Sequence, residues 1–178
     1  MTVKAFYQKV LNPDIVGELQ QYANQVEKFV PVEQHYNGRV YQSVNVHRIP
    51  NEHQVNRHIV RAFKSFNDKY YNYDLFGTFE IQVLRYVPGG GYDWHSDYGI
   101  SENPKGDRKL SMSIQLSPMW DYSGGDVIIR DWYNRDCFMD RELGNIMVFD
   151  SRAPHKVKPL NSGERLAIVA WAHGPKLR

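Results

Sequence analysis

Residues 86–97 read Tyr-Val-Pro-Gly-Gly-Gly-Tyr-Asp-Trp-His-Ser-Asp, and the rest of the chain is organised around this stretch. The proline and the three glycines end one strand, and an extended segment follows that carries His95 and Asp97. Alternate side chains of a strand share a face, so His95 and Asp97 can bind one ion together. The stretch therefore predicts a turn between two strands and two of the ligands of a metal site.

His155, which follows Pro154 after a predicted strand, is the candidate third ligand. Two histidines and one carboxylate are the ligand set typical of non-haem Fe(II), and they leave three coordination positions open. A His-x-Asp pair alone carries little weight in a chain with seven histidines. Arg165 adds weight, because an arginine at the start of a buried strand needs an anion. That anion is either a structural carboxylate such as Asp150 or a bound ligand.

Length and charge narrow the class of protein. A chain of 178 residues is expected to form one domain, 1–178, in which 1–75 supports a core formed by 76–175. The net charge of +2, without a basic run, gives no reason to expect a nucleic-acid partner. The only cysteine is Cys137, which excludes an internal disulfide and suits a reducing compartment. No stretch is apolar enough to span a membrane, so a soluble, cytoplasmic protein is expected.

The first 75 residues predict two helices and an extended segment. Asn12 can cap a helix that begins at Pro13. A second helix is expected to begin near Asn51, whose side chain can cap it, and to carry an apolar stripe as far as Phe66. Residues 32–49 lie between the helices and are predicted to be extended.

From Phe76 onward the apolar residues recur with period two, which predicts a mainly β fold, a sandwich or jelly roll with the helices packed outside. Residues 165–171 are apolar on both faces beyond the arginine and should form a central strand. Residues 110–116 alternate between a core face and a polar face, and the polar face either meets water or lines a wet cavity. The apolar set is Leu110, Met112, Ile114 and Leu116, and the polar set is Ser111, Ser113 and Gln115, of which we place Ser113 and Gln115 on the inner face.

One set of residues resembles a known family, the 2-oxoglutarate- and Fe(II)-dependent dioxygenases. The likeness covers about residues 76–175 and is to the prolyl 4-hydroxylase-like branch, in particular its short prokaryotic and phage members. The resemblance implies a double-stranded β-helix, which is a jelly roll of cupin type. The matching residues are Tyr86, Tyr92, His95, Asp97, Gly124, Gly125, His155, Val157, Pro159, Gly163, Arg165 and Trp171.

The resemblance also implies roles for these side chains. His95, Asp97 and His155 would be the iron ligands, and Arg165 would bind the distal carboxylate of 2-oxoglutarate. Gln115 stands where the prolyl hydroxylases have a tyrosine. The other implied assignments are Tyr86, Gln115 and Trp171 beside the cosubstrate, and Tyr92, Trp120 and Trp132 at the substrate or behind the site. The implied cofactors are Fe(II), 2-oxoglutarate and O2, and the family also brings ascorbate into consideration.

The implied reaction is hydroxylation of a C–H bond coupled to conversion of 2-oxoglutarate to succinate and CO2. A prolyl residue of a peptide or protein is the leading substrate hypothesis. The alternatives are a free amino acid or other small molecule, or a cupin-type metal-binding module without turnover. Residues 100–109 predict either a mobile flap over the metal or an ordinary surface loop. Trp120 and Trp132 either hold a proline-rich peptide or pack at an edge, and the oligomeric state is left open.

Overall fold

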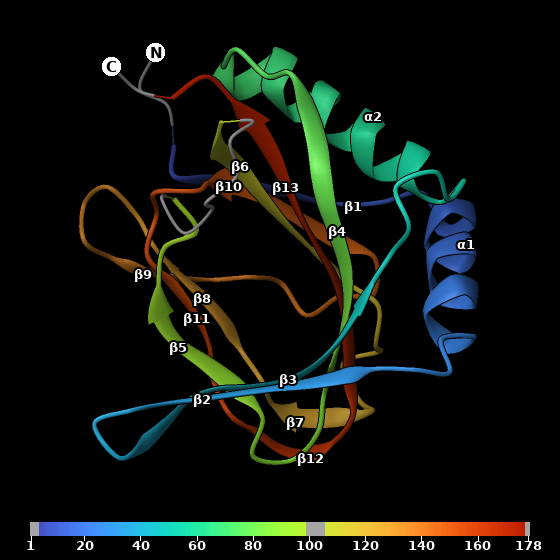
Figure 1. Cartoon of the computed structure of the whole chain (residues 1–178), viewed down its shortest axis with the longest axis vertical. Helices are drawn as coiled ribbons and strands as arrows, with labels where there is room; N and C mark the ends of the chain where they lie inside the picture. The colour runs from blue at the N-terminus through green and yellow to red at the C-terminus, as the bar shows by residue number, and fades with distance from the viewer. Residues whose placement is uncertain (1–3, 99–105, 177–178) are drawn as a thin grey trace.

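The computed structural model describes residues 4–98 and 106–176, and strands dominate it (Figure 1). No helix within these residues is long and apolar enough to cross a membrane. The helical segments are α1 (Pro13–Asn24), α2 (Asn56–Phe66) and a π-helical turn (Asn67–Tyr71). The strands are β1 (Phe6–Val10), β2 (Val30–Tyr36), β3 (Arg39–Arg48), β4 (Gly77–Tyr86), β5 (Gly91–His95), β6 (Asp107–Gln115), β7 (Tyr122–Gly124), β8 (Val127–Arg130), β9 (Asp136–Phe138), β10 (Asn145–Asp150), β11 (His155–Val157), β12 (Leu160–Gly163) and β13 (Arg165–Gly174).

The main sheet curls on itself and is antiparallel throughout. Its strand order is β1-β10-β6-β13-β4-β3-β5-β11-β8-β9, and β2 pairs with β3. The strands β10-β6-β13-β4 form one wall and β5-β11-β8-β9 the other, and β3 joins the two walls by pairing with both β4 and β5. This arrangement confirms the predicted jelly roll. Strand β13 lies between β4 and β6, which confirms that residues 165–171 form a central strand.

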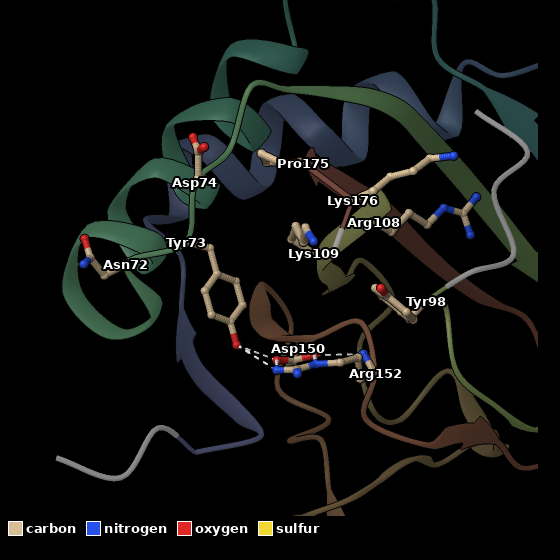
Figure 2. A pocket seen from close by; sticks show the side chains of 10 residues that line it. All are labelled: Asn72, Tyr73, Asp74, Tyr98, Arg108, Lys109, Asp150, Arg152, Pro175 and Lys176. Carbon is tan, nitrogen blue, oxygen red and sulfur yellow. Dashed lines mark hydrogen bonds and ion pairs between the residues drawn. The ribbon is translucent and has the colours of Figure 1, made fainter. Parts of the chain in front are cut away.

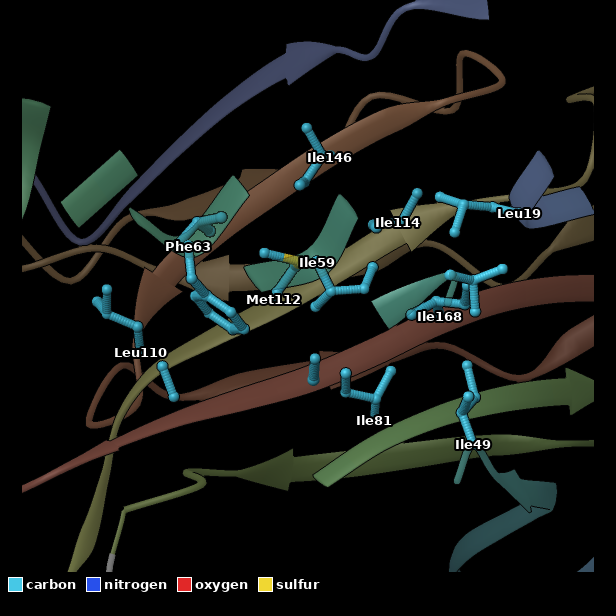
Figure 3. Packing of buried hydrophobic residues seen from close by; sticks show 14 of the residues in the cluster. Leu19, Ile49, Ile59, Phe63, Ile81, Leu110, Met112, Ile114, Ile146 and Ile168 are labelled. Carbon is cyan, nitrogen blue, oxygen red and sulfur yellow. The ribbon is translucent and has the colours of Figure 1, made fainter. Parts of the chain in front are cut away.

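The apolar core lies between the two helices and the outer face of the β10-β6-β13-β4 wall (Figure 3). The predicted alternation of residues 110–116 is confirmed, because the apolar set of β6 packs against this core. The polar set therefore points into the barrel. The residues that meet at this interface include Leu19 of α1, Ile59 and Phe63 of α2, Ile81 of β4, Leu110, Met112 and Ile114 of β6, Ile146 of β10 and Ile168 of β13.

The two helices begin differently. The side chain of Asn12 accepts a hydrogen bond from the backbone N–H of Asp14, as the capping prediction requires. The predicted start of α2 near Asn51 is wrong, because α2 begins at Asn56 and has no side-chain cap. The side chain of Asn56 instead donates to the carbonyl oxygens of Pro50 and Asn51, at 2.8 and 3.1 Å. These bonds hold the preceding residues in turns, so the helix starts one turn later.

The predicted extended segment is the β2–β3 hairpin, which turns at Asn37 and Gly38, both with positive φ. Strand β1 also joins the main sheet, along the edge of β10. The first 75 residues therefore contribute strands to the same sheet as the later residues, in addition to the helices that cover it.

Replacing Ile168 with alanine tests the core. Ile168 is 0% exposed in the central strand, so the truncation should lower the free energy of unfolding by about 2–5 kcal/mol in urea denaturation. Val60, on the outer side of α2, is 50% exposed, and Val60→Ala should change that free energy by about 0.5 kcal/mol or less. Equal losses in the two variants would contradict this placement of the core.

Candidate metal centre

Strand pairing brings the three predicted metal ligands together. His95 ends β5, Asp97 follows two residues later, and His155 begins β11. Strands β5 and β11 pair so that His155 lies opposite His95, and the centroids of the two imidazole rings are 4.2 Å apart. The register of one antiparallel pair thus places two distant histidines beside one carboxylate.

The ligand atoms of this cluster converge. His95 Nε2 lies 3.7 Å from Asp97 Oδ1, and His155 Nε2 lies 3.5 Å from Asp97 Oδ2. The Nδ1 atoms lie 2.7 Å from the carbonyl oxygen of Asp93 for His95, and 3.0 Å from that of Ala153 for His155. A carbonyl only accepts, so each Nδ1 carries the proton and each Nε2 keeps its lone pair. The three residues therefore fit one divalent cation, with both imidazoles oriented for it.

The charge state also suits a cation. Burial, and to a lesser degree the charge of His155, lower the pKa of His95 to about 4. Burial acts to raise the pKa of Asp97, but the two imidazoles and hydrogen bonds from Ser111 and Trp171 outweigh it and lower the pKa. At neutral pH the site therefore presents a neutral His95 and a charged carboxylate.

Two buried serines, Ser111 and Ser151, support the carboxylate. Ser111 Oγ donates to Asp97 Oδ2 at 2.7 Å and lies 2.9 Å from Ser151 Oγ. Neither serine was predicted to take part in the site. Ser111 had a signal, since it shares the polar face of β6 with Ser113 and Gln115. Ser151 lies in a turn, where periodicity gives no information.

Arg165 begins β13, the strand that also carries Trp171. It is 2% exposed, its Nε donates to Gln115 Oε1 at 3.1 Å, and the guanidinium carbon lies 5.5 Å from the centre of the Tyr86 ring. Its Nη2 atom is buried without a hydrogen-bond partner among the described residues. A buried, incompletely bonded guanidinium is costly without an anion, so this geometry indicates an anionic ligand.

The alternative partner for Arg165, Asp150, is already bound. Arg152 donates to Asp150 Oδ2 at 2.6 Å and Tyr73 donates to the same oxygen at 2.5 Å, as Figure 2 shows. The hypothesis of a structural ion pair between Arg165 and Asp150 is therefore wrong. The two residues begin and end different strands, and this separation is visible only in the fold.

A cavity of about 90 Å³ joins the metal-ligand cluster to Arg165. Ser113 lines this cavity, and Gln115 lies behind it, buried and bonded to Arg165. The amide nitrogen of Gln115 donates to the carbonyl oxygen of Ser117 and to the hydroxyl of Tyr122, at 3.0 and 2.6 Å, which fixes its oxygen toward the arginine. The inner-face placement of Ser113 and Gln115 is confirmed.

Three predicted aromatic residues line the same cavity: Tyr86, Tyr92 and Trp171. Burial raises the pKa of Tyr86 and of Tyr92 to about 12, so both phenols stay neutral and can donate. The Tyr92 ring stacks on His95 with centroids 3.4 Å apart. These contacts place all three aromatics against the candidate ligands or Arg165.

The other two predicted aromatics, Trp120 and Trp132, do not line this cavity. Trp120 is 80% exposed in the loop before β7, and Trp132 is 44% exposed, with its ring 6.0 Å from the Arg152 guanidinium. Residues 100–105 of the predicted flap lie outside the described residues, whereas 107–109 belong to β6.

A larger cavity of about 650 Å³ is lined by residues that include Tyr73, Tyr98 and Arg108 (Figure 2). Its described lining includes Tyr98, Lys109 and the Asp150–Arg152 pair, but none of the three metal ligands and not Arg165. Size alone would favour this cavity. The convergent ligands and the incompletely bonded arginine favour the smaller one as the functional site.

A protein-family model described as the 2OG-Fe(II) oxygenase superfamily matches residues 81–173, about half of the chain. A curated relative, a PKHD-type hydroxylase of Parvibaculum lavamentivorans, is 34% identical over 91 residues. The match covers 51% of this chain and only 40% of that relative. The chain thus spans less than half of the length of this relative.

Solved structures share the fold over nearly the whole chain. A Pseudomonas putida prolyl-4-hydroxylase has a TM-score of 0.77 at 20% identity, covering 96% of this chain and 92% of its own. A prolyl hydroxylase from Trichoplax adhaerens, solved with a hypoxia inducible factor peptide fragment, has a TM-score of 0.73 at 23% identity, covering 95% and 83%. At these identities the likeness establishes the jelly-roll fold.

Metal binding should stabilise the protein through the three ligands. A divalent ion such as Mn(II) at one hundred times its dissociation constant should add about 2.7 kcal/mol to the free energy of unfolding, measured as a rise in melting temperature. His155→Ala should abolish this rise. His58→Ala, which removes an imidazole that binds Glu18 on the helices, should keep it. An unchanged rise in His155→Ala would remove His155 from the ligand set.

The lowered pKa of His95 predicts a pH dependence for the metal-free protein. The unfolded chain gains a proton at about pH 6.5, whereas the folded His95 gains it only near pH 4. The free energy of unfolding should therefore fall as the pH decreases from 6.5 to 4, and this group should contribute nothing above that window. His95→Gln should lose this part of the dependence in urea titrations, and His35→Gln, on exposed β2, should keep it. Identical curves for wild type and His95→Gln would count against the burial of this imidazole.

Proposed function

The chain belongs to the 2OG-Fe(II) oxygenase superfamily, and from this premise we propose that it is an Fe(II)- and 2-oxoglutarate-dependent dioxygenase that hydroxylates a prolyl residue in a peptide or protein. One observation carries the proposal. The buried Arg165 and the cluster of His95, Asp97 and His155 face the same cavity. A metal-ligand set and an anion-binding group are the two elements that such an enzyme needs from its protein.

In this proposal the two ends of the cavity bind different groups. His95, Asp97 and His155 would hold the iron, and Arg165 would bind the distal carboxylate of 2-oxoglutarate through a planar, charge-assisted contact. When bound, the iron and 2-oxoglutarate supply the oxidising chemistry, in which O2 yields succinate, CO2 and a hydroxylated substrate. Ascorbate belongs in the assay as an added reductant.

The surrounding side chains keep these groups in place. Gln115 directs Arg165 through the bond to its Nε, so the Nη2 atom remains available to the carboxylate. The neutral phenol of Tyr86, opposite Arg165 in the β4–β13 pair, would donate a further hydrogen bond. Buried apolar side chains, including Val127 and Phe149, line the rest of the cavity. They lower the local dielectric constant, which strengthens the carboxylate–guanidinium contact.

A peptide substrate is supported by the surface next to Tyr92. A hollow of about 280 Å³ lies between the β2–β3 hairpin and strands β5 and β11, and one of about 420 Å³ adjoins it along the hairpin. The two hollows share Val40, Tyr41 and Asp93. The rings of Tyr36, Tyr41 and Tyr92 follow one another from the tip of the hairpin to the metal ligand His95. Such an open aromatic surface suits an extended chain better than a single amino acid. Trp120 and Trp132 are proposed only as outer contacts of that chain.

Substrate profiling separates the hypotheses. Succinate formation from 2-oxoglutarate would be followed with Fe(II) alone, with proline-containing peptides and with free proline or other amino acids. The proposal expects slow uncoupled turnover that peptides accelerate. Acceleration by a free amino acid alone would support the small-molecule alternative, and no consumption of 2-oxoglutarate under any condition would support a metal-binding module.

Arg165→Lys tests the cosubstrate anchor. Lysine keeps the charge but loses one of two parallel hydrogen bonds, which should weaken 2-oxoglutarate binding about tenfold to a hundredfold, equivalent to about 1.5–3 kcal/mol. Mn(II) should still raise the melting temperature of this variant, which shows that the metal end has folded. Arg48→Lys, on the exposed side of β3, is the matched control. If Arg165→Lys titrates with 2-oxoglutarate as wild type does, the anchor lies elsewhere.

A further inference from the structure

The carboxylate of Asp97 has two oxygens that differ in their surroundings. Oδ1 lies 3.7 Å from His95 Nε2, and Oδ2 lies 3.5 Å from His155 Nε2. By distance alone, either oxygen, or both, could reach an ion held between the imidazoles. Oδ2 accepts the hydrogen bond from Ser111, and the indole of Trp171 also donates to this carboxylate. We infer that Ser111 and Ser151 are positioning residues that restrict Asp97 to one metal bond, through Oδ1, and so keep open the coordination position that dioxygen needs.

The direction of the hydrogen bonds follows from donor counting. The Ser111 hydroxyl donates its single proton to Asp97 Oδ2, at 2.7 Å, and so has no proton left for another contact. The contact between the two serines must then be donated by Ser151 to Ser111 Oγ. A hydroxyl that accepts one bond becomes a better donor of the next. Ser151 therefore strengthens the bond that occupies Oδ2.

Ser151 also fixes the main chain of the ligand. Its carbonyl oxygen accepts from the backbone N–H groups of Asp97 and Tyr98, at 2.9 and 3.0 Å, and its own N–H donates to the carbonyl oxygen of Lys109. On either side of Ser151, Asp150 and Arg152 bind each other in the arrangement that Figure 2 shows. Both the backbone and the carboxylate of Asp97 are thus tied to this turn. The side chain has little freedom to rotate into a two-oxygen mode.

The coordination count explains why one oxygen matters. An octahedral ion has six positions; three protein atoms leave three, of which 2-oxoglutarate takes two and dioxygen the last. If Asp97 bound through both oxygens, the last position would be lost when 2-oxoglutarate binds. This inference rests on the proposed function for its meaning. The hydrogen bond from Ser111 to Oδ2 does not depend on it.

Packing alone does not explain why serines occupy positions 111 and 151. Both hydroxyls are almost fully buried, and a buried hydroxyl costs free energy unless it is hydrogen-bonded, so alanine would suffice for packing alone.

The chain contains a second serine pair, Ser123 and Ser162, whose hydroxyls lie 2.7 Å apart at an exposed site on β7 and β12. That pair contacts no predicted ligand. It provides a matched control for loss of a serine–serine bond.

The test counts the water molecules on bound Mn(II), by water-proton relaxation of the loaded protein with and without 2-oxoglutarate. In wild type, 2-oxoglutarate should leave one exchangeable water in place. In Ser111→Ala, the relaxation due to bound water should fall by about a third without 2-oxoglutarate and disappear with it, because Oδ2 takes one of three open positions. Ser151→Ala should show a smaller change, and Ser111→Thr, which keeps the hydroxyl, and Ser123→Ala should match wild type.

Relaxation in Ser111→Ala equal to wild type, in both states, would overturn the inference, as would a larger change in Ser151→Ala than in Ser111→Ala. If Ser111→Ala does not fold, Ser111→Cys keeps a side chain of similar size with a weaker donor. The bound-water relaxation of this variant in the presence of 2-oxoglutarate should lie between the wild-type value and zero. Failure of the proposed function would look different. In that case 2-oxoglutarate would leave the relaxation of wild type unchanged, while the measurement with Mn(II) alone would still report on Ser111.

Discussion

The antiparallel pairing of β5 with β11 is the constraint on which the candidate site depends. It places His155 opposite His95, and a slip of one residue would turn one imidazole to the outside of the barrel. That register is maintained by the neighbouring strands, since β3 pairs with both β5 and β4, and β8 pairs with the other side of β11. The N-terminal hairpin is therefore part of what keeps the ligands together, although it supplies none of them.

The two ends of the cavity are electrostatically unequal. At the metal end, a charged carboxylate is stabilised by two imidazoles and by hydrogen bonds. At the other end, Arg165 is buried, and its Nη2 has no hydrogen-bond partner in the part of the chain that the structure describes. The protein retains this uncompensated group even though buried charges usually have partners. The free-energy cost of burying this guanidinium indicates that a ligand binds there, and this argument does not depend on the family resemblance.

Periodicity and residue chemistry were sufficient to predict much of this arrangement. The alternation of residues 110–116 predicted the inner and outer faces of β6, and the His95–Asp97 spacing predicted that these two side chains converge, because both features are local. The start of α2 was not predictable, since the Asn56 side chain competes for backbone carbonyls that the capping pattern ignores. Ser151 and the true partners of Asp150 depend on contacts between distant segments, about which a local pattern says nothing.

Trp171 gives the site a built-in optical reporter. Its indole contacts the Asp97 carboxylate on one side and lies against the Arg108 guanidinium, 4.0 Å from the ring centre, on the other. Fluorescence from an indole so close to a paramagnetic ion is quenched, and emission is sensitive to the polarity of the cavity that the ring lines. Occupancy of the centre should therefore change the part of the emission that comes from Trp171, one of the four tryptophans of the chain.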